Sequence, residues 1–435
     1  MQGARARLRA LFDRAVAAVS ADVVMPSELP SAAGWLAIIA VGKAAGAMMR
    51  AATLRTVSPI TGLIVAPPGG LPAGWTPPPS VAVVEGGHPI PNAGSVAGAQ
   101  QALALAATLG PDDLLLALVS GGGSALMAAP APGLTLAEKQ AVTRALLHSG
   151  ATIVEINRVR ACLSRLKGGR LAAAARPARV ATWLISDVPG DDPALVASGP
   201  TVLGTASLAE ARAILRRHGI DSPPAARVLS DPANEPPRAE ADAASEIRVL
   251  ATARNALDAA GVLARELGYQ VLDLGDDLQG EARDLAARHA GLALRWAATG
   301  ARRAILSGGE TTVTVTNPSG RGGRNLEYLL ALAIALDGAP GVSALACDTD
   351  GVDGTEAVAG AMIFPDTLAR ARDAGLDARA LLKQNDAFVF FEALGDLVVT
   401  GPTLTNVNDF RAILIDPGLA FRPFSRKGRR ISGAR

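Results

Sequence analysis

Short runs of apolar residues alternate with longer alanine-rich segments along most of the chain. Apolar runs bounded by turn residues are typical of buried strands, and the segments between them are long enough for helices. The predicted strands span residues 36–41, 61–66, 81–85, 114–119, 180–186, 248–253, 270–274, 304–306, 311–316 and 342–346. The predicted helices span residues 97–109, 134–149, 153–175, 256–267, 281–299 and 326–336. This order favours βαβ units and a mainly parallel sheet.

Five prolines interrupt a polar stretch between residues 221 and 244, and the alternation restarts beyond it. Because few apolar residues lie in this stretch, we take it as a linker. The sequence therefore predicts two α/β domains. The N-terminal one, residues 1–230, is expected to be Rossmann-like with a mainly parallel sheet, and the C-terminal one spans residues 240–420. Residues 421–435 form a basic tail.

Composition excludes several classes of protein. Of the 435 residues 49% are apolar, enough for a sizeable core, and the net charge of +2 is too balanced for a dedicated nucleic-acid binder. Two cysteines far apart offer no disulfide framework. No segment has the roughly 20 apolar residues of a spanning helix, and the N-terminus is typical of an amphipathic helix rather than a signal peptide. We expect a cytoplasmic protein without membrane or nucleic-acid partners.

A lysine follows the first predicted strand, where ligands of open α/β sheets collect. Lys43 lies between Gly42 and the start of a helix, and a phosphate there would meet free backbone N–H groups and an ammonium together. A surface lysine is the alternative. The chain has only five lysines against 37 arginines, which favours a selected role for Lys43.

A glycine-rich turn, Ser120-Gly121-Gly122-Gly123-Ser124, follows the strand predicted at 114–119. Its backbone can approach an anion closely, which predicts binding of nucleotide phosphates, although an ordinary flexible turn has the same composition. The chain contains no Walker A motif. No G-x-G-x-x-G follows the first strand either, which weakens a dinucleotide-binding interpretation.

Acidic residues follow two later strands. Asp187, Asp350 and Asp353 are predicted to bind Mg²⁺ or a substrate hydroxyl, with turn formation as the alternative role. Arg324 lies among glycines, which suits phosphate binding. We expect Asn325 to cap the next helix and, with Gly322 and Gly323, to complete an anion site.

Four further residues are assigned to substrate binding: His88, Arg160, Glu310 and Asn408. His88 lies in a loop of the right type, but a structural hydrogen bond would explain it equally well. Glycine turns, rigid arginines, a strand-end lysine and aspartates together favour phosphoryl transfer, because these groups neutralise and orient a phosphoryl group with a divalent metal.

The motifs taken together resemble those of the class II glycerate kinases (glycerate 2-kinase, MOFRL family), in order from Val41 to Ile415. They are Val41-Gly42-Lys43-Ala44, Gly87-His88-Pro89, Ser120-Gly121-Gly122-Gly123-Ser124, Asn157-x-x-Arg160, Ser186-Asp187-Val188, Gly308-Gly309-Glu310, Gly322-Gly323-Arg324-Asn325, Asp350-Gly351-x-Asp353-Gly354 and Thr405-Asn406-Val407-Asn408-Asp409. The resemblance implies ATP-dependent phosphorylation of D-glycerate to 2-phosphoglycerate with Mg²⁺. It also implies an active site in the cleft between two α/β domains, and catalytic roles for Lys43 and Arg324. Asp187 is our third catalytic candidate.

The sequence departs from the family pattern at two positions beside these motifs: Leu326 stands where Gln is usual, and Leu404 where Gly is usual. The main rival function is an NAD(P)H-dependent hydroxypyruvate reductase, since members of the family have been labelled so. A non-enzymatic nucleotide-binding module is the third. The sequence leaves open whether the chain forms a homodimer and whether the product carries its phosphate at the 2- or the 3-hydroxyl.

Overall fold

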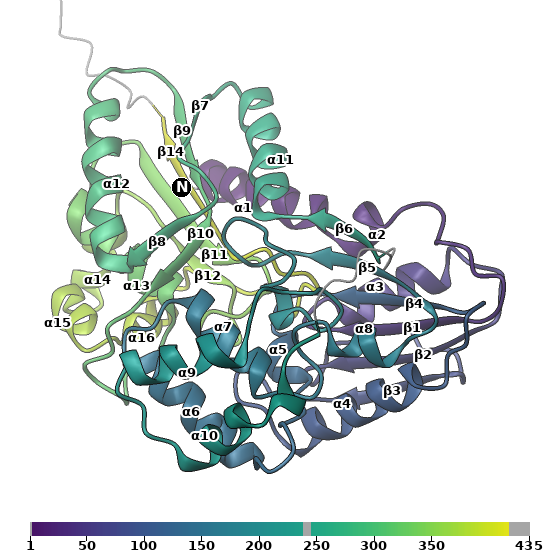
Figure 1. Cartoon of the computed structure of the whole chain (residues 1–435). Helices are drawn as coiled ribbons and strands as arrows, with labels where there is room; N and C mark the ends of the chain where they lie inside the picture. Colours follow the sequence, from purple (N-terminus) through teal and green to yellow (C-terminus); the bar gives the residue numbers. More distant parts are fainter. Residues whose placement is uncertain (1, 238–244, 417–435) are drawn as a thin grey trace, which may run out of the picture.

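Two six-stranded sheets, each covered by helices, make up the protein (Figure 1). The computed structural model describes residues 2–237 and 245–416. The predicted basic tail, residues 421–435, lies outside the described residues.

The first sheet is parallel throughout and has the order β3-β2-β1-β4-β5-β6. Its strands are β1 (Leu36–Val41), β2 (Ile60–Ala66), β3 (Val81–Glu85), β4 (Leu114–Val119), β5 (Arg179–Ile185) and β6 (Ser245–Ala251). Successive residues of β1 enter two different cores, because Ile38 faces one helix layer and Ile39 the other. Burial on both faces explains the uninterrupted apolar runs in the sequence.

Helices pack on both faces of this sheet. Short α2 (Ala21–Val24) and α3 (Ala45–Thr53) lie on one side, and α4 (Ala93–Ala106), α5 (Gly123–Leu126) and α8 (Arg170–Ala174) on the other. A separate helical group with its own core consists of α6 (Leu136–His148), α7 (Ile153–Cys162), α9 (Leu208–Arg217) and α10 (Pro223–Ser230). Two 3₁₀ turns lie at Val196–Ser198 and Pro232–Asn234.

The second sheet is mixed, with the order β13-β12-β11-β14-β9-β7. Its strands are β7 (Gln270–Asp273), β9 (Arg303–Ser307), β11 (Val342–Asp348), β12 (Gly360–Ile363), β13 (Leu397–Val398) and β14 (Asp409–Ile415). One face packs on α12 (Ala282–Ala297), α13 (Arg324–Leu336) and α16 (Ala387–Leu394), and the other on α1 (Gln2–Ala18) and α11 (Ala253–Glu266). Helices α14 (Thr367–Asp373) and α15 (Ala378–Lys383) lie nearby, and β8 (Leu278–Glu281) pairs with β10 (Gly309–Thr312) in a small parallel sheet.

The sheets divide the chain differently from the predicted ranges 1–230 and 240–420. β6 begins at Ser245 yet completes the first sheet by pairing with β5. Conversely, α1 is the first helix of the chain, yet it packs against α11 and β14 of the second unit. The proline-rich stretch is therefore a connection within the first unit rather than a boundary between units.

Two predicted elements were too long. The helix predicted at 153–175 is divided into α7, which ends at Cys162, and α8, which begins at Arg170, because Gly168 and Gly169 before α8 adopt φ values of 62° and 82°, outside the helical region. The strand predicted at 311–316 ends at Thr312, where its partner β8 also ends. Within residues 2–237 and 245–416, no helix is long and apolar enough to cross a membrane.

Phe12 tests whether α1 belongs to the core of the second unit. Its side chain is fully buried, and its ring centroid lies 6.1 Å from that of Phe410 in β14. We expect Phe12→Ala to lower the free energy of unfolding by about 3–5 kcal/mol, as for other large buried side chains. Urea denaturation measures this, with exposed Val23→Ala as the control. Equal stability of the two variants would contradict the packing described.

Candidate active site

Lys43 at the end of β1 meets a carboxylate of the second unit. Its ammonium forms an ion pair with Asp350, in the loop after β11. Burial alone would lower the pKa of Lys43, but the carboxylates of Asp350 and Asp348 hold it above its ordinary value. The lysine therefore stays protonated and marks the place where the strand ends of the two sheets face each other.

The glycine-rich turn lies directly beside Lys43. The backbone N–H of Lys43 donates to the carbonyl of Gly121 at 2.9 Å, and that of Ala44 donates to Ser120 Oγ at 3.0 Å. A Cβ added at Gly121 would lie 2.1 Å from a carboxylate oxygen of Asp187. Only glycine allows the turn to approach Asp187 so closely.

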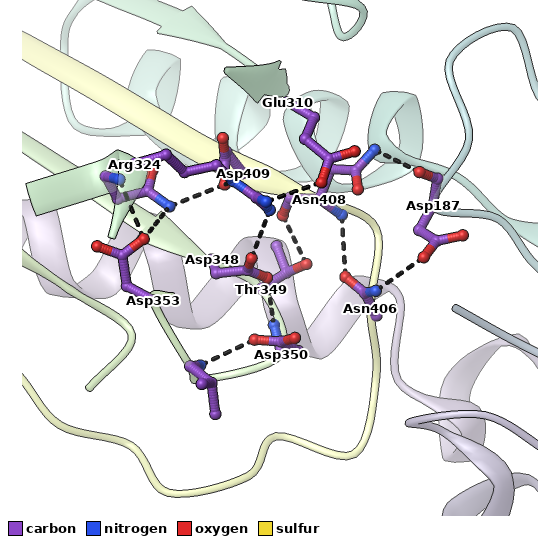
Figure 2. Close-up of polar contacts among 12 residues, drawn as sticks. Asp187, Glu310, Arg324, Asp348, Thr349, Asp350, Asp353, Asn406, Asn408 and Asp409 are labelled. Carbon is purple, nitrogen blue, oxygen red and sulfur yellow. Dashed lines mark hydrogen bonds and ion pairs between the residues drawn. The ribbon is translucent and has the colours of Figure 1, made fainter. Parts of the chain in front are cut away.

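Asp187, two residues beyond β5, is held by the segment before β14. Asn406 Nδ2 donates to its carboxylate at 3.0 Å, and Asn408 Nδ2 donates to its backbone carbonyl at 2.6 Å (Figure 2). Burial, followed by the negative charge of Glu310, raises the pKa of Asp187 to about 6. The carboxylate is thus placed between the two units and is more basic than an exposed aspartate.

Arg324, the first residue of α13, is surrounded by acids. Its guanidinium contacts Glu310 at 2.7 Å, Asp348 at 2.7 Å and Asp409 at 2.8 Å. Asp348 also accepts the backbone N–H of Asp350 at 3.1 Å (Figure 2). Since Asp350 pairs with Lys43, Arg324 and Lys43 are joined through neighbouring carboxylates. Of the three acids around Arg324, Glu310 is the most exposed, with 45% of its side chain accessible. A ligand reaching Arg324 would therefore displace Glu310 first.

The N-terminus of α13 is occupied by the chain itself. Asp353 is fully buried and accepts the backbone N–H groups of Asn325 at 3.0 Å and Leu326 at 2.9 Å. Asn325 is therefore inside the first turn, and the predicted capping role is wrong: Gly323 is the N-cap residue and Asp353 supplies the capping carboxylate. Gly323 allows Asp353 to come close, since a Cβ there would lie 2.4 Å from the carboxyl carbon of Asp353.

The carboxylates around Lys43 and Arg324 are oxygen ligands of the kind that Mg²⁺ prefers, but by themselves they do not form a complete metal site. The carboxylates outnumber the cations there: Asp187, Glu310, Asp348, Asp350 and Asp409 against Lys43, Arg324 and Arg411. Burial and the charge of Asp350 raise the pKa of Asp348 well above its usual range. Yet the described residues contain no group of three or more His, Cys, Asp or Glu arranged to hold a metal ion. Mg²⁺ commonly binds with one or two carboxylates plus substrate phosphates, and this arrangement fits that mode.

Two of the predicted substrate-binding residues lie near different residues of the glycine turn. His88 approaches Gly122, since a Cβ there would lie 3.1 Å from the imidazole, and enclosure followed by the charge of Lys43 lowers the pKa of His88 to about 4. Arg160, on α7, lines a different pocket together with Ser124. Arg160 therefore does not join the group around Lys43.

Comparison with known proteins places this geometry in a family. The model of a domain of unknown function, DUF4147, matches residues 7–230, and the MOFRL family model matches residues 303–409. The D-glycerate 2-kinase of Thermotoga maritima is 35% identical over 405 residues, 92% of this chain and 95% of its own length. The chain belongs to the DUF4147/MOFRL glycerate kinase family. This confirms the resemblance inferred from the motifs.

Other relatives of this glycerate kinase family member differ in name. A protein of Agrobacterium vitis that carries the provisional name hydroxypyruvate reductase is 49% identical over 422 residues, 95% of this chain and 94% of its own. A crystal structure of glycerate kinase from Thermotoga maritima matches with a TM-score of 0.84 at 33% identity, covering 95% of this chain and 100% of that one. The expected two-domain α/β architecture is thereby confirmed.

Three site residues of this family member were not assigned a role from the sequence: Asp348, Asn406 and Asp409. Asp409 begins β14, a strand that the sequence analysis did not predict although residues 410–415 are almost entirely apolar. That run is the signal that would have placed Asp409 and the preceding asparagines at a strand end. Asp348 is the last residue of β11; the sequence places it in the same acidic loop as Asp350 and Asp353, but specific roles were assigned only to those two.

The two departures from the family pattern have different settings. Leu326 is fully buried in α13, beside the Asp353 cap. Leu404 has a φ of 59°, in the left-handed region that favours glycine, and it precedes the segment that holds Asp187. The conformation of Leu404 explains why glycine is usual at this position.

Substitution of Asp353 separates a capping role from a metal-binding one. Asp353→Ala leaves two buried N–H groups without partners, so we expect the free energy of unfolding to fall by about 3 kcal/mol or more. Asp377→Ala removes an exposed cap from α15 and is expected to cost about 1 kcal/mol. Urea unfolding with and without a chelator measures both. A chelator-dependent loss in the wild type, absent in Asp353→Ala, would indicate a metal ligand instead.

Proposed function

We propose that the protein transfers the γ-phosphoryl group of ATP to the 2-hydroxyl of D-glycerate. The observation that carries this proposal is the convergence of Lys43 and Arg324, from different units, on carboxylates beside the glycine turn. Phosphoryl transfer requires charge neutralisation and positioning more than covalent chemistry, and two fixed cations beside a close-approaching backbone supply both. The names of the Thermotoga maritima relatives support the same reaction.

In the proposed reaction the hydroxyl oxygen of glycerate attacks the γ-phosphorus, and the bond from that phosphorus to the β–γ bridging oxygen breaks. Asp187 orients the hydroxyl and takes its proton, for which its raised pKa suits it. Lys43 and Arg324 neutralise the charge that spreads over the transferring group. The products are 2-phosphoglycerate and ADP.

The backbone of the turn from Ser120 to Gly123 would hold nucleotide phosphates. Mg²⁺ would enter with the nucleotide, and Asp350 is the carboxylate placed to share it, since it already contacts Lys43. When bound, the ion would offset the excess of carboxylates described above. His88 and Asn408 lie beside Gly122 and Asp187 and are proposed to contact glycerate.

The rival function is reduction of hydroxypyruvate by NAD(P)H, which the provisional name of the 49% identical relative suggests. The turn after β1 places Lys43 rather than a glycine-rich dinucleotide fingerprint at the ligand-binding edge of the sheet. We therefore favour the kinase. A coupled assay that compares ADP formation from ATP and glycerate with NAD(P)H oxidation by hydroxypyruvate distinguishes the two functions.

Substitution of Lys43 or Arg324 tests their proposed catalytic roles. We expect Lys43→Ala and Arg324→Ala each to lower kcat for ATP-dependent glycerate phosphorylation by about 10²-fold or more, as for other groups that stabilise transition-state charge. Lys383→Ala, an exposed lysine on α15, serves as the control and should keep wild-type turnover. Near-normal rates in both site variants would overturn the proposed mechanism.

The close approach of the turn to Asp187 gives an independent test. Gly121→Ala would push the Asp187 carboxylate and the Asn406 amide out of place, because the added Cβ would lie 2.1 Å and 2.4 Å from them. We expect kcat to fall at least roughly tenfold, since small displacements at an active site are costly. Gly291→Ala is the control, because its Cβ would lie 3.7 Å from the nearest atom, in Arg295. Full activity of Gly121→Ala would show that Asp187 need not hold its position.

A further inference from the structure

A second pocket opens beside the glycine turn, away from Lys43. It lies between α6, α7 and the loop that follows β3. Ser124, the last residue of the turn, forms part of its wall. A ligand seated here would therefore contact the turn at Ser124.

The pocket is cationic. Lys139, Arg144 and Arg160 line it, and none of its lining residues carries a carboxylate. Lys139 is buried and its ammonium donates to one protein acceptor, the carbonyl of Leu163 at 2.9 Å. Among residues 2–237 and 245–416, Arg160 has one long hydrogen bond, 3.5 Å to the Asn157 side chain. Because buried charge without a counter-charge is costly, an anionic ligand would stabilise this group of side chains.

Burial and, for Lys139, a neighbouring positive charge lower the pKa values of these side chains. Burial, then the nearby Arg160, lowers the pKa of Lys139 to about 7, and burial lowers that of Arg160 to about 10. A phosphate between them would remove the repulsion and favour the protonated forms.

An apolar rim lies at the other end of the pocket. Ile90 and Leu147 line it, and each is 60% exposed. Lys139 and Leu147 are two helical turns apart on one face of α6, about 12 Å at 1.5 Å per residue. Gln140 ties the opposite loop to the helix by donating to the carbonyl of Pro91 at 2.9 Å. The pocket thus offers cations near the turn and apolar side chains farther out.

We propose that this pocket holds the nucleoside diphosphate part of the phosphoryl donor. The base packs between Ile90 and Leu147, and the two non-transferred phosphates contact Lys139, Arg144 and Arg160. The terminal phosphate then reaches the turn at Gly122 and, beyond it, Lys43. A three-carbon acid would fill only one end of the pocket. A nucleotide matches the pocket better, because it is longer and has both a charged and an apolar end. Arg160 accordingly binds the nucleotide rather than the acceptor substrate that the sequence suggested.

The inference rests on the proposed kinase function, and binding measurements separate it from that function. Arg144 is exposed and has no hydrogen bond or ion pair within the described residues, so its substitution leaves the fold intact. We expect Arg144→Glu and Leu147→Asp each to weaken binding of fluorescent N-methylanthraniloyl-ADP to the full chain at least tenfold without glycerate present. Arg216→Glu on α9 and exposed Leu54→Asp are the matched controls and should bind as the wild type does.

Steady-state kinetics show whether ATP or glycerate occupies the pocket. KM for ATP should rise in Arg144→Glu, while KM for glycerate stays within twofold of wild type. Unchanged ADP binding with a raised KM for glycerate would overturn the proposal and place the carboxylate of the acceptor in the pocket. Failure of the wild type to bind the ADP analogue would also overturn it. If the wild type binds the analogue in this pocket but does not phosphorylate glycerate, the proposed function fails and the nucleotide pocket stands.

Discussion

The ion pair between Lys43 and Asp350 joins the carboxyl end of β1 to the loop after β11, and most of the candidate site is arranged around it. On one side, the glycine turn bonds to the backbone of Lys43 and approaches Asp187. On the other, Asp350 bonds to Asp348, which holds Arg324. Each contact alone is an ordinary polar interaction. Together they require the two sheets to present their strand ends to the same space, and a hydrophobic core shared by both units holds them so.

Electrostatic balance explains why such a site suits a phosphorylated ligand with its metal. Acids outnumber bases around Arg324, whereas the charged residues that line the pocket beside Ser124 are all cations. A metal ion bound to the transferring phosphate would offset the acids, and the remaining phosphate oxygens would meet the cations of the pocket.

Much of the fold followed from local pattern. Strands β1, β3 and β4 begin and end where the sequence predicted, because each is an apolar run closed by glycine, proline or acidic residues. The membership of β6 in the first sheet could not be predicted this way, since pairing with β5 depends on tertiary packing and leaves no local signal. The same holds for Asp353, whose position in the sequence resembles a metal site, although its side chain is directed at the N–H groups of α13. Lys43, Asp187 and Arg324 could be proposed because ligands of open α/β sheets bind at strand ends and glycine turns, which the sequence shows before any contact is known. Their roles stay predictions.

The chain passes between its two units twice. It leaves α1 on the second sheet to build the first, and it returns from β6 to α11 at Thr252. Both passages adjoin the same layer, where α1 and α11 pack together. Residues 19–35 and Thr252 are therefore the two places where the backbone connects the units. A cut at Thr252 would leave the second unit without α1, which packs against α11 and β14, so that unit could not complete its own core.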